Sequence, residues 1–114
     1  MRITLILAGI ALLTSCATKA QTFTHNSADL QIAAYKSCAL TKAMSLASSP
    51  DSAIDIAKVS IGLCENRLQA VNEKLREENK ANTYAGLYSN RFTDGLRDGL
   101  VSVVASEVMK KRAQ

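Results

Sequence analysis

The sequence predicts an all-α fold, and three observations lead to that prediction. Apolar residues make up 47% of the 114 residues, yet only 4% are aromatic and Trp is absent, so the core should consist of closely approaching, alanine-rich helices. Glycine occurs five times and proline once, so residues that break helices are few. The longest β-branched run, residues 100–104, is interrupted by Ser102. The length leaves room for one small domain at most.

The first residues have the pattern of an export signal. Met1 and Arg2 give a short basic start, and the run at residues 3–13 is predominantly apolar. A helix over that run rises only about 16 Å, too little for a hydrocarbon core of about 30 Å. We therefore expect residues 1–15 to be a cleaved signal peptide rather than a membrane span.

The segment Leu13-Thr14-Ser15-Cys16 follows this run directly. An aliphatic residue, two small residues and a cysteine at the end of an apolar segment resemble the lipobox of bacterial lipoproteins. The resemblance covers the first sixteen residues. It implies that the Cys16 thiol receives a diacylglyceryl group, that signal peptidase II cuts before Cys16, and that the new amine is acylated. Two or three acyl chains give a stable membrane anchor, whereas one chain binds only marginally.

Residues 16–26 are then the lipidated N-terminus and a polar tether. Ala17 follows the cysteine, which resembles the outer-membrane-sorted lipoproteins of Gram-negative bacteria. We therefore expect a lipid-anchored protein of the bacterial cell envelope, on the periplasmic face of the outer membrane. The alternative is cleavage after Ala20, with Thr18 and Ala20 as the small residues at the cut, which would release a soluble periplasmic protein.

Residues 27–112 are expected to form a small helical domain, and residues 27–48 predict its first helix. This segment lacks Gly and Pro and is rich in Ala, Leu, Lys and Gln. Asn26 or Ser27 can cap the helix, and Asp29 suits its first turn.

Residues 51–78 predict a second helix. Ser49 can cap it, Pro50 fits a first position where no amide donor is needed, and Asp51 favours the positive helix end. Its apolar residues recur in alternating steps of three and four, which places them on one stripe that can pack on a partner helix. These residues are Ile54, Ala57, Ile61, Cys64, Leu68, Val71 and Leu75.

Cys38 and Cys64 are expected to form a disulfide between these two helices. Each lies thirteen residues from Asp51, so an antiparallel hairpin folded at that turn brings both sulfur atoms to one level. The third cysteine, Cys16, is taken by the lipid, which leaves an even pair. In an oxidising compartment the bond should persist and stabilise the fold by about 3.5 kcal/mol. A redox-active pair is the weaker interpretation, because the two cysteines of such a pair usually lie close in sequence.

Residues 92–111 predict a third, C-terminal helix packed on the disulfide-stapled hairpin. Phe92, Leu96, Leu100, Val104 and Val108 recur every four residues, and the hairpin has apolar residues that need such a cover. Gly95 and Gly99 fall on one side of this helix, where we expect a close backbone approach at a helix crossing. The basic tail at residues 110–112 should complement the helix dipole at its C-terminus.

Residues 79–91 could be a loop or continue a helix. Tyr84, Leu87 and Tyr88 flank Gly86 there and are expected to cap the open end of the hairpin. The alternative is that Tyr84 and Tyr88 contact a binding partner, because tyrosine is enriched at interfaces.

Charge and motifs exclude several classes of function. The net charge is +4, but residues 20–109 hold nine Lys or Arg against ten Asp or Glu, so a nucleic-acid-binding face is not expected. His25 is the only histidine, and no nucleophile–base pair, phosphate loop or metal-ligand cluster is present. The sequence therefore predicts a protein that is not an enzyme and has no metal, cofactor or small-molecule substrate.

The remaining expectation is a membrane-tethered helical module that binds a protein partner, a second copy of itself, or serves a structural role in the envelope. A second hypothesis is an inhibitor or exclusion factor of the kind that phages and plasmids encode as small lipoproteins. A third is membrane perturbation by an amphipathic helix at residues 92–112.

Overall fold

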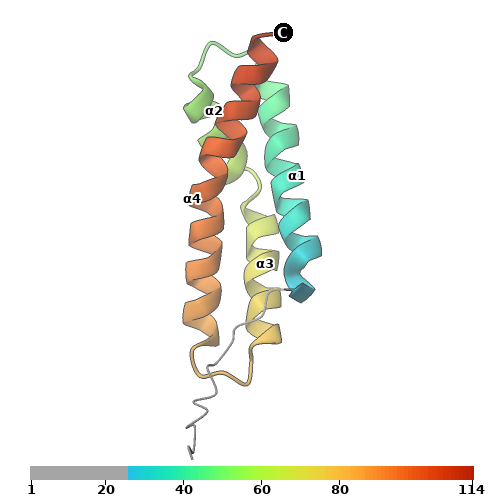
Figure 1. Cartoon of the computed structure of the whole chain (residues 1–114), viewed down its shortest axis with the longest axis vertical. Helices are drawn as coiled ribbons and strands as arrows, with labels where there is room; N and C mark the ends of the chain where they lie inside the picture. Colours follow the sequence, from blue (N-terminus) through green and yellow to red (C-terminus); the bar gives the residue numbers. More distant parts are fainter. Residues whose placement is uncertain (1–25) are drawn as a thin grey trace, which may run out of the picture.

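The computed structural model describes residues 26–114, and this part of the chain consists of helices joined by short turns, with no strand among the described residues (Figure 1). A 3-10 turn, η1 (Asn26–Ala28), leads into α1 (Asp29–Leu46), followed by α2 (Ala53–Gly62), α3 (Glu65–Glu78) and α4 (Ala85–Arg112). α1 runs along the bundle, α2 and α3 return along it in succession, and α4 runs parallel to α1 (Figure 1). The all-α prediction is confirmed, as is a C-terminal helix packed on the hairpin.

The turn between α1 and α2 uses a different cap from the expected one. Ser52, not Ser49, is the N-cap of α2, and its side chain accepts a hydrogen bond from the Asp55 amide at 3.1 Å. The Ser49 hydroxyl instead donates to the Asp51 carboxylate at 2.7 Å. The predicted start at Asp51 is therefore two residues early, because the turn itself uses Ser49 to Asp51.

The predicted helix over residues 51–78 is interrupted at Leu63 and Cys64. Cys64 has φ −106° and ψ 17°, outside regular helical geometry, and is the N-cap of α3. Gly62, the last residue of α2, has one of the lowest helix propensities, which favours an end at this point. The predicted stripe continues across the interruption. All its members are buried except Ile54, which is 54% exposed: Ala57, Ile61, Cys64, Leu68, Val71 and Leu75.

α4 begins at Ala85, seven residues before the predicted start. Two asparagines stabilise the connection from α3 through hydrogen bonds to the backbone. The Asn79 side chain donates to the Leu75 carbonyl at 2.8 Å, and the Asn82 side chain accepts from the Tyr84 amide at 2.9 Å. The first turns of α4 pack on α3 through the small polar residues Ser89 and Thr93, while Tyr88 continues the four-residue spacing of Phe92 and Leu96 and packs against the core.

The core runs the length of the bundle and is built largely from small side chains, with Tyr35 the largest fully buried one. Its α1 side consists of Tyr35 and three alanines on one face: Ala39, Ala43 and Ala47. α4 contributes Leu100, Val104 and Val108, which were expected there. Alanine at these positions lets the helices approach closely.

Arg112 closes the far end of the bundle. Its guanidinium donates to the backbone carbonyls of Ala47 at 2.9 Å, Ser49 at 2.7 Å and Asp51 at 2.6 Å. We expected the basic tail to complement the dipole of its own helix. Arg112 also satisfies the C-terminal carbonyl of α1 and the turn that follows, which ties α4 to the α1–α2 connection.

Candidate functional site

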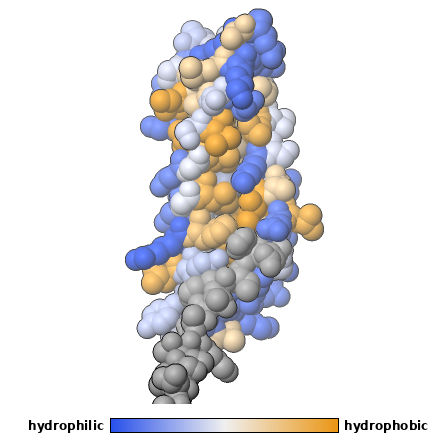
Figure 2. Space-filling view, in the orientation of Figure 1, coloured by the Kyte–Doolittle hydropathy of each residue, from blue (hydrophilic) through white to orange (hydrophobic). Residues whose placement is uncertain are grey.

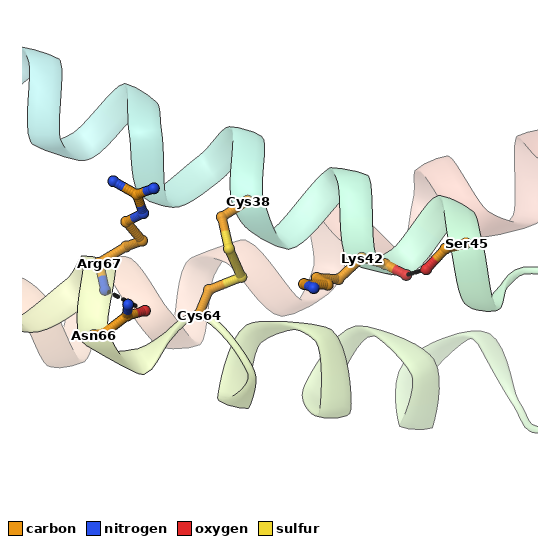
Figure 3. The surroundings of a disulfide bond; sticks show 6 residues. All are labelled: Cys38, Lys42, Ser45, Cys64, Asn66 and Arg67. Carbon is orange, nitrogen blue, oxygen red and sulfur yellow. Dashed lines mark hydrogen bonds between the residues drawn. A yellow bond between two sulfur atoms is a disulfide. The ribbon is translucent and has the colours of Figure 1, made fainter.

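The two cysteines predicted to pair do so. Cys38 on α1 and Cys64 at the junction of α2 and α3 form a disulfide with their Cα atoms 6.0 Å apart (Figure 3). Cys64 has no exposed surface, and Cys38 packs against the core. Cys64 thus anchors the bond in the core, while Cys38 is partly buried at its edge, and the bond ties α1 to the junction of α2 and α3. Cys16, the expected lipidation site, lies outside the described residues.

The two tyrosines singled out in the sequence have different surroundings. Tyr88 is half-buried and packs against the core, with its ring centroid 6.0 Å from that of Phe92. Burial raises the pKa of the Tyr88 hydroxyl, and the negative charge of Glu78 raises it further. Tyr84 precedes α4 and is 62% exposed. Tyr88 therefore caps the core, and only Tyr84 leaves most of its ring accessible.

An apolar groove lies between α1 and α4, on the face where Figure 2 shows hydrophobic residues gathered. We call it the α1–α4 groove. Its volume is about 250 Å³. The residues that line it are Lys36, Leu40, Gly95, Leu96, Gly99, Leu100 and Val103. Val103 is 52% exposed, and Leu40 and Leu96 are only partly buried. Lys36 is the single charged residue in this lining, so the groove is a mainly apolar surface open to solvent.

The two glycines of this groove do not serve a helix crossing, contrary to expectation. A Cβ atom built on Gly95 or on Gly99 meets nothing within 4 Å. Neighbouring helices of the bundle therefore do not approach the α4 backbone at either position. The glycines instead leave a stretch of bare helix backbone at the edge of the groove.

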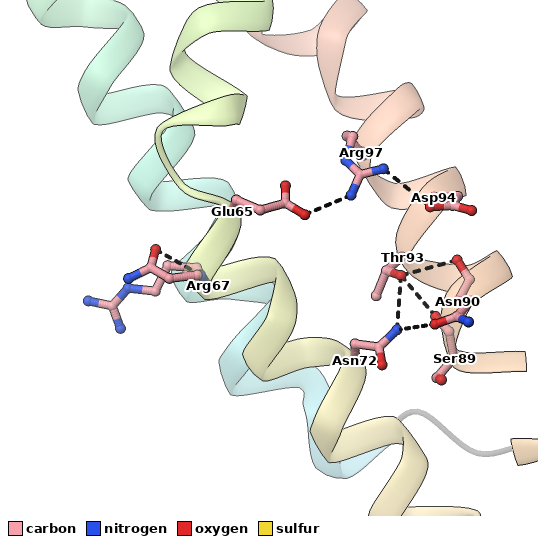
Figure 4. Close-up of polar contacts among 9 residues, drawn as sticks. Glu65, Arg67, Asn72, Ser89, Asn90, Thr93, Asp94 and Arg97 are labelled. Atoms are coloured by element: carbon pink, nitrogen blue, oxygen red, sulfur yellow. Dashed lines mark hydrogen bonds and ion pairs between the residues drawn. The ribbon is translucent and has the colours of Figure 1, made fainter. Parts of the chain in front are cut away.

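A polar seam joins α3 to α4 on another side of the bundle (Figure 4). The Asn72 amide donates to Asn90 at 2.9 Å and to Thr93 at 3.3 Å. Arg76 donates to the Ser89 hydroxyl at 3.2 Å. The open groove above this seam has a volume of about 530 Å³. Its polar groups are largely engaged with one another, so the seam positions α4 on α3.

Arg97 continues the seam through an ion pair with Glu65 at 2.9 Å and a second with Asp94 at 3.2 Å. Partial burial acts to lower the pKa of Arg97, but the hydrogen bond and charge of Glu65, with Asp94, outweigh it and raise that pKa. The group stays a cation throughout the physiological range. Both pairs are partly exposed, so each contributes little to stability.

No protein family, curated protein or solved structure matches this chain. Within residues 26–114, no three His, Cys, Asp or Glu side chains lie close enough together to hold a metal ion. No helix in the same range is both long and apolar enough to cross a bilayer.

The groove was not predicted, although its α4 residues had been assigned other roles. Leu96 and Leu100 were assigned to the apolar repeat of the C-terminal helix, and Gly95 and Gly99 were assigned to a helix crossing. Lys36 and Leu40 gave no signal, because nothing in the sequence states which side of α1 faces α4. The two glycines on one side of the predicted helix, Gly95 and Gly99, were the one available clue.

Proposed function

We propose that this protein is a small lipid-anchored module of the bacterial envelope that binds a protein partner in its α1–α4 groove. The observation that carries the proposal is the open apolar groove itself, with half-exposed Val103 and partly buried Leu40 and Leu96 along it. The lipobox resemblance at Leu13 to Cys16 supports the anchor. The occupant that suits a groove between two parallel helices is the apolar face of a third helix.

The glycines support a closely approaching partner. Each glycine inside a helix costs about 1 kcal/mol relative to alanine. The space above Gly95 and Gly99 is open, so the bundle itself would accommodate alanine at both positions. Small residues at a helix surface let a second backbone come close, which increases the contact area of the pair. A partner helix lying across these positions would benefit from both glycines.

Photo-crosslinking in intact bacteria tests this proposal. A benzophenone amino acid replaces Val103 in the groove of the full-length chain, and in a control chain it replaces the exposed Gln69 on α3. We expect one discrete crosslinked protein from position 103 in the membrane fraction, and none of that size from position 69. Equal products from both positions, or none from position 103, would contradict the binding role.

A further inference from the structure

A second exposed surface shares no residue with the α1–α4 groove. Asp55, Val59, Leu63 and Arg67 are spaced by four residues along α2 and the start of α3, and we call them the α2–α3 stripe. Val59 and Leu63 are 54% and 59% exposed, and Asp55 and Arg67 are also exposed. Residues four apart lie on one side of a helix. Val59 and Arg67 both border grooves shared with α1. The stripe therefore stays on the same side of the bundle before and after the interruption at Cys64.

The two ends of the stripe carry opposite charge. At one end, Asp51 and Asp55 border a groove of about 270 Å³. At the other end, Lys42 and Arg67 border a groove of about 360 Å³ on the side of the disulfide (Figure 3). None of these four side chains takes part in an ion pair within residues 26–114. Arg112 lies beside Asp51, so the charge pattern belongs to the four stripe residues themselves: the Asp55 carboxylate at one end, Val59 and Leu63 in the middle, and the Arg67 guanidinium at the other end.

We infer that this stripe binds a second copy of the same chain in an antiparallel, two-fold arrangement. A two-fold interface uses the same patch on both copies, so the patch must be complementary to itself. A two-fold axis between Val59 and Leu63 meets that condition. It sets Asp55 opposite Arg67 of the second copy and Val59 opposite Leu63 of the second copy. Gly62 lies beside this midpoint, and a Cβ built on it meets nothing within 4 Å, so the second backbone has room.

The dimer should be weak in dilute solution and form where the chain is concentrated. The stripe offers two exposed apolar side chains per copy, whereas stable interfaces bury about 800 Å² on each partner. Anchoring at one membrane confines neighbouring copies to a surface layer and so raises their effective concentration. Only this gain in concentration rests on the proposed lipid anchor.

Charge reversal tests the arrangement. Two full-length copies with different tags are produced in one bacterial cell, fixed with formaldehyde and captured through the first tag, and the second tag is then measured. Asp55→Arg in both copies, or Arg67→Asp in both, sets like charges against each other at both ends of the interface. We expect either change to lower the recovered second tag about fivefold or more, whereas Arg91→Asp, which reverses an exposed charge on α4 outside the stripe, leaves it unchanged.

The decisive measurement combines the two different variants in one cell, which we call the mixed pair. Asp55→Arg in one copy and Arg67→Asp in the other restores opposite charges at both ends, so recovery should return to the wild-type level. Recovery that no reversal changes, or a mixed pair no better than either reversal alone, would overturn the inference, as would no recovery in the wild type. Thermal unfolding of each purified variant confirms that it folds. Capture works for anchored and soluble chains alike, and failure of the anchor would show separately as loss of the protein from the membrane fraction.

Discussion

Two hydroxyl groups are buried in the core without a hydrogen-bond partner among the described residues. They are Tyr35 Oη and Ser60 Oγ, and neither residue has any exposed surface. Leaving a buried polar group unsatisfied costs about 1–3 kcal/mol. Removing either hydroxyl while keeping the shape of the side chain should therefore maintain or raise stability.

Ser60→Ala is expected to raise the free energy of unfolding by up to about 1 kcal/mol, because the desolvated hydroxyl is lost and alanine favours the helix. Ala57→Ser is the matched control. Ala57 is also fully buried on α2, so the added hydroxyl should lower stability by about 1–3 kcal/mol. Urea unfolding measures both. A Ser60→Ala variant destabilised as much as Ala57→Ser would mean that Ser60 does have a partner.

Tyr35→Phe should change how stability depends on pH. Burial raises the pKa of Tyr35 above its ordinary value of 10.0, with Glu65 and Asp98 adding to the rise and Arg97 opposing it. The folded state therefore favours the neutral phenol. The contribution of this preference to the free energy of unfolding is complete below about pH 10 and is lost as the pH rises through the folded-state pKa. Urea unfolding between about pH 9 and pH 11 should show a smaller loss of stability for the Phe variant than for the wild type. Equal losses would contradict the assignment.

Single residues could be predicted where geometry left one solution. Cys38 and Cys64 lie at equal distances from the turn at Asp51, so a hairpin leaves them level. The different surroundings of Tyr84 and Tyr88 were not predictable, because they depend on α4 beginning at Ala85. Similarly, an internal glycine fits a helix crossing and an open groove equally well until the neighbouring helices are placed.

At the scale of the elements, apolar periodicity predicted the helices but not all their ends. The buried apolar residues of the predicted second helix keep their steps of three and four through Cys64. Their spacing therefore gave no sign of the interruption there. The start of α4 was predicted incorrectly for a different reason. Tyr84 and Tyr88 continue the four-residue spacing of Phe92, but Gly86 and the polar residues that face α3, Ser89 and Thr93, weaken the helical signal there.

Gly95→Ala and Gly99→Ala should each raise the free energy of unfolding by about 0.5–1 kcal/mol, because alanine is the better helix former and its Cβ would meet open space. The pair of changes should also weaken partner capture from position 103. Gly62→Ala is the control, since its Cβ is equally free but lies outside the groove. Chemical unfolding and photo-crosslinking measure the two effects. A loss of stability on either substitution in α4 would restore the explanation by a helix crossing.

Arg112→Ala should lower stability by about 1 kcal/mol, since three backbone carbonyls of the α1–α2 turn lose their charged donor. Lys111→Ala, which removes the neighbouring positive charge, should change stability by less than about 0.5 kcal/mol. Thermal unfolding of the pair compares the specific hydrogen bonds with a general effect of charge. Equal effects would show that the tail acts only through its charge.

At the scale of the whole molecule, the two ends of the bundle have different roles. The described part of the chain begins at η1, which packs beside α3 near its C-terminal end, and Arg112 closes the opposite end (Figure 1). A tether attached at η1 would hold that end toward the membrane and leave the α1–α4 groove and the α2–α3 stripe along the sides. The sequence predicted the helical hairpin and its cover. It could not predict these side surfaces, because they depend on how the helices are rotated against one another.

The intact mass of the detergent-extracted protein, with and without reductant, tests the account most directly. We expect a chain that begins at Cys16, carries a diacylglyceryl group and an amine-linked acyl chain, and gains two hydrogens when the bond between Cys38 and Cys64 is reduced. An unmodified chain that begins at Gln21, or a mass that reductant leaves unchanged, would contradict a lipid-anchored, disulfide-linked bundle.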